Sequence, residues 1–203
     1  MPKYIAIAAI TMDGRIARHS KEHVDWTSPE DKEHLRGKMR ECDVIVLGNN
    51  TYQTSKEFLL KYSKVVFTKS VSGIKKESDS LTFINANDAD VSEFFEKSGY
   101  KNVCVLGGSQ VYSYFLKAGL IDEIWLTIEP KIFGSGINLF NFSTSSGSAL
   151  SKNEEVDPST SSGSTTNASK SQKVDKKMET REYKLVNVKQ LNQRGTVLLH
   201  YTK

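Results

Sequence analysis

The sequence contains little cysteine and no long apolar run. Its two cysteines, Cys42 and Cys104, stand in separate apolar stretches. Because this spacing fits neither a disulfide framework nor a set of metal ligands, we expect buried free thiols of a reducing compartment and no bound metal. Every apolar run falls short of the roughly 18 residues that span a bilayer, so a membrane partner is not predicted.

A large excess of one charge is also missing. The chain has 28 Lys and Arg against 24 Asp and Glu, which gives a formal net charge of +4. The Lys residues are scattered and no Arg-rich run occurs, so nucleic acid is not an expected partner. The apolar run at residues 3–10 is short and meets no small-residue cleavage site, so it predicts a first strand of a cytoplasmic protein.

Short apolar runs alternate with helical patterns along most of the chain. Strands are predicted at residues 4–10, 43–47, 64–68, 81–84, 102–106, 123–129, 183–191 and 196–201. Helices are predicted at residues 29–41, 50–58, 88–98 and 110–117. This alternation indicates the α/β class, with a mostly parallel eight-stranded sheet and helices on both faces. The last two strands have a short connection and should form an antiparallel hairpin at the edge.

One segment differs in composition from the rest. Fifteen of the 31 residues from 143 to 173 are Ser or Thr, and the run "STSSGS" occurs there twice. Such a segment cannot bury enough apolar surface to offset its ordering entropy. We therefore predict a single domain over residues 1–203 with a disordered surface loop at residues 143–173.

The stretch "WTSPEDKEHL" (residues 26–35) permits two interpretations of Asp31. Ser28 can cap a helix, Pro29 suits its first turn, and an acidic residue at position 31 suits the positive end of the helix dipole. Alternatively, Asp31 is an acid kept for chemistry. The local pattern by itself leaves both interpretations open.

The run "NVCVLGGSQVYSYFL" places two glycines between a strand and a helix. Gly107 and Gly108 let the backbone approach a ligand, and the free amides of the helix start near Ser109 attract phosphate. An anionic ligand such as a dinucleotide pyrophosphate is predicted here. A tight turn that needs glycine for its geometry alone would leave the same pattern.

These stretches occur in a family order. The succession "IAAITMDGRIA", "WTSPEDKEHL", "VIVLGNNTYQTS", "VVFTK", "VLGGSQVYSYFL", "DEIWLTIEP" and "GSGINLF" resembles dihydrofolate reductase and its relatives, which include the reductase domain of riboflavin biosynthesis. The resemblance runs from residue 4 to about residue 140 and resumes at Tyr183. It implies a dihydrofolate reductase-like three-layer sandwich. It also implies a monomeric or homodimeric oxidoreductase that uses NADPH to reduce 7,8-dihydrofolate, a pterin, to tetrahydrofolate in one-carbon metabolism.

The resemblance assigns roles around the substrate. Asp31 matches the single active-site carboxylate, which would promote protonation of the substrate; Trp26 matches a tryptophan beside the mobile loop that "MDGRIA" begins, and Thr127 a threonine bonded to the acid and the pterin. A carboxylate shielded by apolar side chains would have a raised pKa, which suits an acid. The expected substrate contacts are Ile7, Ala8, Ala9, Leu35 and Lys61.

The resemblance also assigns a cofactor side. Thr68 and Lys69 match a pair that contacts the 2′-phosphate of NADPH, and the remaining positions match the pyrophosphate and nucleotide contacts. The expected cofactor residues are Gly48, Asn49, Thr51, Ser55, Thr68, Lys69, Gly107, Gly108, Ser109, Gln110 and Val111. Taken singly, Thr51 is equally a helix cap and Lys69 a solvated turn residue.

Several departures keep other functions open. Lys61 and its neighbours stand where dihydrofolate reductases have an Arg that grips the folate tail, and Lys lacks the bidentate fork. The chain also lacks the D-N-P-x-L-T-x-R run with which riboflavin-pathway reductases grip a phosphate, and it lacks their zinc deaminase pattern. We therefore favour dihydrofolate over a pyrimidine ribosyl phosphate or another small heterocycle. A nucleotide-binding protein without catalytic activity is the third hypothesis.

Overall fold

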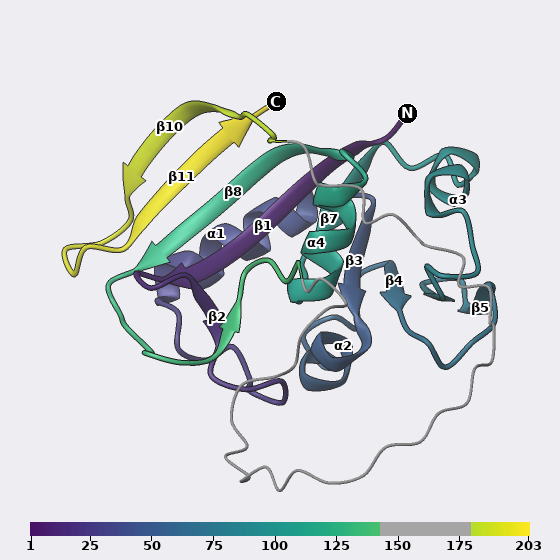
Figure 1. The fold of residues 1–203 in the computed structure, drawn as a ribbon, viewed down its shortest axis with the longest axis horizontal. Helices are drawn as coiled ribbons and strands as arrows, with labels where there is room; N and C mark the ends of the chain where they lie inside the picture. Colours follow the sequence, from purple (N-terminus) through teal and green to yellow (C-terminus); the bar gives the residue numbers. More distant parts are fainter. Residues whose placement is uncertain (143–179) are drawn as a thin grey trace, which may run out of the picture. The chain divides into compact units, whose positions relative to one another are not determined.

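The computed structural model describes residues 1–142 and 180–203, and the predicted loop at residues 143–173 lies outside them. The main sheet has nine strands in the order β10-β11-β8-β1-β7-β3-β4-β6-β5 (Figure 1). These strands are β1 (Lys3–Thr11), β3 (Val44–Gly48), β4 (Lys64–Phe67), β5 (Ile74–Ser78), β6 (Leu81–Ile84), β7 (Asn102–Val105), β8 (Ile121–Glu129), β10 (Lys184–Gln190) and β11 (Val197–Thr202). A second, two-stranded sheet joins β2 (Arg15–Ala17) to β9 (Ile137–Asn138).

The predicted α/β class and the antiparallel hairpin at the edge are confirmed. Neighbouring strands from β8 to β6 are parallel, whereas β11 runs antiparallel to β8 and β10 antiparallel to β11. The sheet has one strand more than the predicted eight, because β5 pairs antiparallel with β6 at the other edge. The sequence of β5, "IKKES", is exposed throughout and offers no apolar alternation, so the pattern gave no signal for it.

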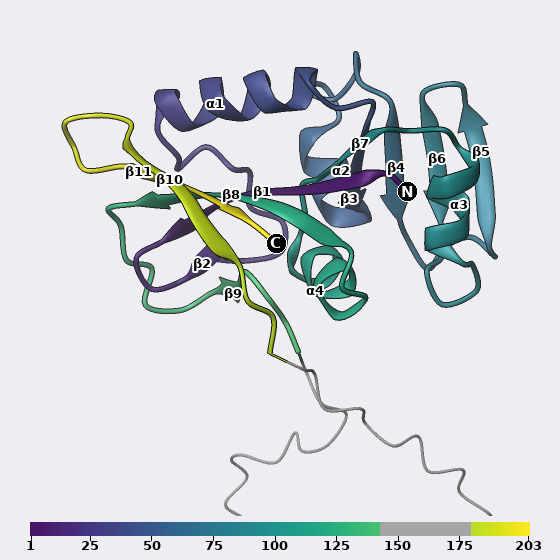
Figure 2. The same cartoon turned by 90° about the horizontal axis from the view of Figure 1, so that it is seen from above.

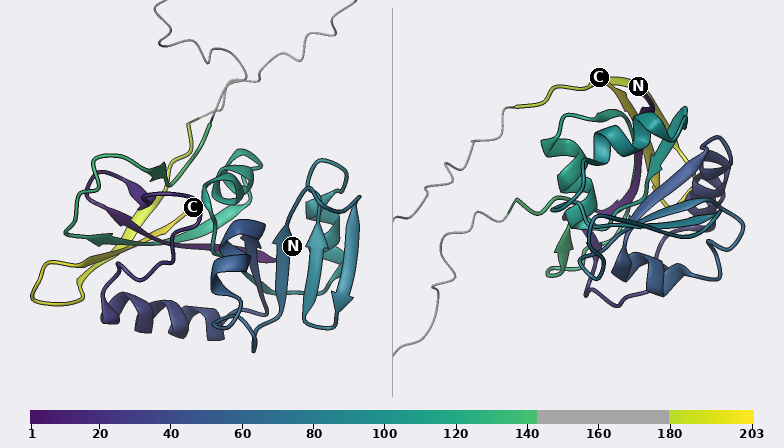
Figure 3. Two further views of the ribbon diagram at one scale, coloured as in Figure 1. Left: turned by 90° about the horizontal axis from the view of Figure 1, so that it is seen from below. Right: turned by 90° about the vertical axis from the view of Figure 1, so that its right-hand side faces the viewer.

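Helices cover both faces of the sheet, as predicted (Figure 2). The helices are α1 (Pro29–Arg40), α2 (Asn49–Ser55), α3 (Val91–Lys97) and α4 (Ser109–Lys117). One apolar cluster joins Met39 of α1 to strand residues such as Ile7 and Leu47, and another joins Phe95 of α3 to Phe115 of α4. Burial of each such side chain contributes about 1.5–3 kcal/mol. The view along the sheet in Figure 3 shows the same three layers.

The helices of the described residues begin in two different ways. Ser28 caps α1 by accepting a hydrogen bond from the Asp31 amide, and Asp90 caps α3. The helices α2 and α4 begin after Gly48 and Gly108, which have no side chain to cap them. The first amides of α2 and α4 are therefore available to an outside acceptor.

The chain connections create a topological switch point at the carboxyl ends of β3 and β7. The connection from β3 through α2 crosses one face of the sheet, and the connection from the adjacent β7 through α4 crosses the other. In open α/β sheets such a switch point, at the carboxyl ends of the strands, is where ligands bind. Here it lies beside Gly48 and Gly107.

Two further findings concern the cysteines and the membrane. Both cysteines are free thiols; Cys104 is buried, as predicted, whereas Cys42 is only half-buried. Within the described residues, none of the helices has the length and apolar character needed to cross a bilayer.

Candidate functional site

Asp31 lies in the first turn of α1 and is 6% exposed. Burial raises its pKa above 3.8, the charge of Glu129 raises it further, and hydrogen bonds from the side chains of Thr127 and Thr27 act in the opposite direction. A carboxyl group in these surroundings is held closer to protonation than an exposed one. Both interpretations of Asp31 thus fit, because the residue shares in the cap of α1 and is also a buried acid.

Thr127 reaches Asp31 because of strand alternation. It is 2% exposed and lies opposite Ala9 of β1 in the parallel pair of β8 with β1. Trp125, two residues earlier on β8, packs in the same cluster as Met39 of α1, so alternate residues of β8 face α1. Thr127 therefore lies on the sheet face that α1 covers.

The predicted substrate contacts of β1 divide between the two faces. Ile7 packs in the cluster below α1 together with Leu35, whereas Ala8 packs in the cluster below α4. Ala9 follows Ile7 on the α1 face. Strand alternation thus gives Ile7 and Ala9 side chains on the Asp31 side, while Ala8 can line that side only through its backbone.

Trp26 packs against the connection that follows β8. It is 6% exposed, its ring packs edge-on against Phe133 at 5.1 Å, and its carbonyl accepts a hydrogen bond from Lys131. The segment predicted to lead into a mobile loop is tied to the same connection. The side chain of Asp13 accepts hydrogen bonds from the amides of Phe133 and Gly134, and Thr11 donates to it at 2.5 Å.

The predicted phosphate cradle is assembled from two loops. The Gly48 amide donates to the Gly107 carbonyl at 2.7 Å, which joins the ends of β3 and β7. A Cβ on Gly108 would lie 3.5 Å from Thr51 Oγ1, and a Cβ on Gly48 would lie 3.4 Å from Val111 Cγ2. Gly48, Thr51, Gly107, Gly108 and Val111 are therefore brought together.

One polar atom in the cradle lacks a partner. Ser109 Oγ is buried without a hydrogen-bond partner, at the first residue of α4. A buried hydroxyl without a partner costs about 1–3 kcal/mol, so it calls for an acceptor or donor from outside the chain. Together with the uncapped amides of α2 and α4, this atom fits the phosphates of a dinucleotide such as NADPH.

The other predicted cofactor residues follow β4 or belong to α2 and α4. Thr68 Oγ1 accepts from the Ser70 amide at 3.1 Å just after β4, and Lys69 beside it is exposed. Asn49 Oδ1 accepts from Gln53 within α2 at 3.2 Å. Ser55 ends α2, and Gln110 is exposed in the first turn of α4.

The lysines that replace the expected Arg do not form a carboxylate grip in this structure. Lys61 is exposed and lies 5.3 Å from the centre of the Tyr62 ring. Lys64 is 7% exposed and donates to the carbonyls of Leu59 and Tyr62, at 3.0 and 2.6 Å. Its ammonium group therefore forms hydrogen bonds with backbone carbonyls after α2 and does not face a ligand carboxylate.

Sequence reasoning missed Tyr112, which links the two halves of the site. Its hydroxyl donates to the Ile7 carbonyl at 2.5 Å, and its ring occupies the space beside Gly107 where a Cβ would lie. Burial raises its pKa, with a contribution from the negative charge of Asp31. In the sequence Tyr112 is one of several aromatics on an amphipathic helix, which gives no signal of this contact.

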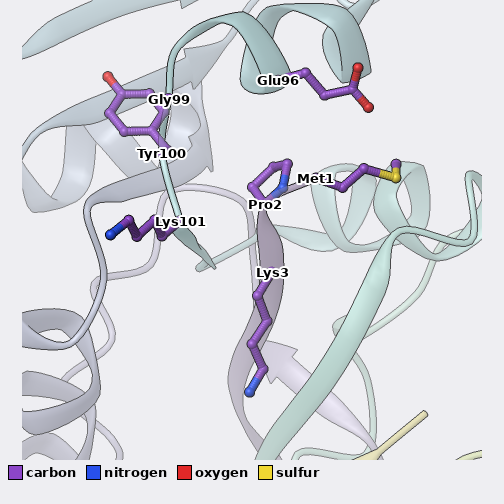
Figure 4. Close-up of a pocket in the computed structure, with 7 residues that line it drawn as sticks. All are labelled: Met1, Pro2, Lys3, Glu96, Gly99, Tyr100 and Lys101. Atoms are coloured by element: carbon purple, nitrogen blue, oxygen red, sulfur yellow. The ribbon is translucent and has the colours of Figure 1, made fainter.

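A hollow of about 480 Å³ lies elsewhere, between the start of β1 and the turn before β7 (Figure 4). Met1, Lys3, Glu96 and Lys101 line part of it. Lys3 and Lys101 belong to the amino ends of these parallel strands, whereas Gly107 follows a carboxyl end. The hollow contains none of the predicted site residues.

Comparison with solved structures supports the dihydrofolate reductase-like fold. A pyrimidine reductase-like protein from Corynebacterium diphtheriae is 15% identical, with a TM-score of 0.67 over 99% of this chain and 91% of that chain. A dihydrofolate reductase from Enterococcus faecalis complexed with NADP(H) and RAB-propyl is 17% identical, with a TM-score of 0.58 over 98% and 95%. The 5-amino-6-(5-phosphoribosylamino)uracil reductase of Thermotoga maritima, joined to a deaminase, is 20% identical, with a TM-score of 0.63 over 99% of this chain and 56% of that chain.

Comparison of sequences gives a narrower result. The uncharacterized protein YwjB of Bacillus subtilis is 26% identical over 145 residues, which cover 68% of this chain and 83% of that protein. The family model of the RibD C-terminal domain matches residues 2–157. This match covers the candidate acid, the strand threonine and the glycine cradle.

Proposed function

Because the chain belongs to the RibD C-terminal domain family, we propose that it is an NADPH-dependent reductase of the riboflavin-pathway type. The proposed substrate is a small heterocycle of the class that the Thermotoga maritima relative is named for, a phosphoribosylamino pyrimidine. The family match supports this alternative better than the reduction of dihydrofolate that the sequence pattern favoured.

One observation carries the proposal: the buried Asp31 lies beside Thr127, at the same strand ends as the glycine cradle. A protein that only binds nucleotides needs the cradle but no buried acid next to it. A carboxyl group with a raised pKa is more readily held protonated, so that it can give a proton to a substrate atom that gains negative charge during reduction.

Different residues of the chain have different roles in this proposed reaction. When bound, NADPH supplies the hydride. The first amides of α2 and α4 and the Ser109 hydroxyl would hold its phosphates, and Lys69 its 2′-phosphate. Asp31 would protonate the nitrogen next to the carbon that accepts the hydride, and Thr127 would orient its carboxyl group. Each turnover thus consumes one hydride and one proton.

Dihydrofolate is the second candidate substrate. It is favoured by the buried Asp31 carboxyl beside a strand threonine, which suits protonation of a pterin ring. The burial of Lys64 and the exposure of Lys61 speak against it, because neither forms a fork for the carboxylate tail of folate.

The test compares both substrates with purified protein. We expect NADPH oxidation with the pyrimidine substrate, and we expect the Asp31→Asn variant to lower kcat/KM by about 10²–10⁴-fold while NADPH still binds. Turnover with dihydrofolate alone would assign the second candidate instead. NADPH binding without turnover of either substrate would contradict the reductase and leave a nucleotide-binding protein.

A further inference from the structure

A second buried carboxyl group lies near Asp31. Glu129, the last residue of β8, is 2% exposed and lies two residues beyond Thr127 on the same face of the strand. No sequence pattern had singled it out. The negative charge of Glu129 contributes to the raised pKa of Asp31.

The carboxyl group of Glu129 joins three elements of the fold. Its Oε1 accepts a hydrogen bond from the Ser28 amide at 2.6 Å. Its Oε2 accepts one from Thr196 Oγ1 at 2.9 Å, in the turn before β11. The carboxyl group therefore connects the end of β8 to the start of α1 and to the C-terminal hairpin.

The hairpin adds a second connection to α1. Asn192 Nδ2 donates to Thr196 Oγ1 at 3.0 Å and to Glu30 Oε2 at 3.0 Å. Glu30 precedes Asp31 in the first turn of α1. The start of α1 is thus held at Ser28 and at Glu30 by one network that contains Glu129.

This network reaches Asp31 through the helix cap. The Ser28 amide donates a hydrogen bond to Glu129 Oε1, and Ser28 Oγ accepts one from the Asp31 amide at 3.3 Å. A buried hydrogen bond to a charged group contributes about 1.5–3 kcal/mol, enough to fix the backbone at this point. The side chain of Asp31 is thereby directed toward Thr127.

We propose that Glu129 is a positioning residue. It fixes the first turn of α1 so that Asp31 lies against Thr127 near the carboxyl end of β8. This inference rests on the proposed reductase function, in which Asp31 is the acid. Glu129 acts through Ser28 and Asp31, without a contact to the substrate of its own.

Several charged groups lie near the start of α1, and some of them shift the pKa of Asp31. Glu129 on β8 raises the pKa of Asp31, and Lys32 on α1 lowers it. Lys131 donates to the Trp26 carbonyl, and the charge of Arg194 from the hairpin acts on Glu30. Removal of the Glu129 charge is therefore expected to lower the pKa of Asp31.

The experiment compares Glu129→Gln with a matched control on the same strand. Glutamine keeps the shape but removes the charge and one of the two acceptor oxygens, so it cannot accept from both the Ser28 amide and Thr196 Oγ1 in the same way. Glu123→Gln makes the same chemical change at the other end of β8, where Glu123 pairs with Lys3 and His200 at 3.0 and 2.8 Å. The Asp31 pKa is measured by ¹³C NMR of the carboxyl carbon, assigned with Asp31→Asn, and kcat/KM is measured as a function of pH.

We expect Glu129→Gln to lower the Asp31 pKa, to move the fall of kcat/KM at high pH toward lower pH, and to reduce kcat by about tenfold to a hundredfold. Glu123→Gln should change none of these. An unchanged Asp31 pKa and an unchanged pH profile in Glu129→Gln would overturn the inference. A shifted Asp31 pKa in a protein without turnover would instead count against the reductase function alone.

A second pair of variants keeps the test decisive if Glu129→Gln does not fold. Thr196→Val removes the hydrogen bond to Glu129 Oε2 and leaves the charge, whereas Thr196→Ser keeps the hydroxyl. We expect the Val variant to lose kcat by about tenfold with the KM for NADPH unchanged, and the Ser variant to retain it. Equal kcat in the two variants would contradict the positioning role.

Discussion

The amide of Gly48 donates a hydrogen bond to the carbonyl of Gly107 at 2.7 Å, and this contact joins the ends of β3 and β7. Each glycine leads into a helix without a capping side chain, so the starts of α2 and α4 are brought to one place. Backbone amides at helix starts favour an anion. The glycines therefore determine the position of the cradle, and the ring of Tyr112 packs against Gly107.

Replacement of Gly107 by Ala should destabilise the protein. Gly107 has φ +87°, and a Cβ there would lie 2.7 Å from Tyr112 Cζ. We expect Gly107→Ala to lower the free energy of unfolding by about 3 kcal/mol, measured by urea denaturation. Gly73→Ala is the control, since Gly73 has φ +60° but no atom within 4 Å of its Cβ position. It should cost about 1 kcal/mol, and equal losses would contradict the role of Tyr112.

Loss of Lys69 should weaken the preference for NADPH over NADH. Lys69 is exposed beside Thr68, and a lysine bonded to a phosphate forms a charge-assisted hydrogen bond. We expect Lys69→Ala to raise the KM for NADPH by about tenfold or more and to leave the KM for NADH unchanged. Lys75→Ala, on β5 where Lys75 pairs with Glu77, is the control and should change neither constant. If both cofactors weaken together in Lys69→Ala, the 2′-phosphate contact is wrong.

The burial of Asp31 should make stability depend on pH. Because its pKa in the folded protein is raised above 3.8, the folded state binds this proton more tightly than the unfolded state. The stabilising contribution is full below the unfolded pKa and is lost as pH rises through the folded pKa. We therefore expect the Tm of Asp31→Asn, relative to that of the unaltered protein, to increase between about pH 4 and about pH 8.

A control on the same helix separates this effect from a general one. Glu33 is exposed on α1, so Glu33→Gln should give a Tm difference that stays flat over the same pH range. If the Tm difference for Asp31→Asn also stays constant with pH, burial does not raise the pKa of this carboxyl group in the folded protein.

Local sequence patterns were sufficient to predict the secondary-structure elements around Asp31 and around Gly107 and Gly108. Ser28, Pro29 and Asp31 form a helix start within a few residues, and Gly107 and Gly108 stand between a strand and an amphipathic helix. The order of these stretches along the chain then indicated the fold. Local signals of this kind depend only on neighbouring residues, which a sequence displays directly.

Other features depend on residues that are far apart in the chain. Glu129 is 101 residues from Ser28 and 67 from Thr196, and on its own it is an ordinary residue at the end of a strand. The contact of Tyr112 with Ile7 spans 105 residues. Neither could be predicted without the fold, because the partners of a buried polar group are set by packing.

The most direct test of the central claim follows the hydride itself. The protein is incubated with NADPH that carries deuterium at both C4 positions and with 5-amino-6-(5-phosphoribosylamino)uracil, and the product is analysed by mass spectrometry. If the buried Asp31 and the glycine cradle form a reductase site, the product carries one deuterium, and Asp31→Asn forms little of it. Bound NADPH with no deuterium in any product, from this substrate or from dihydrofolate, would contradict the account.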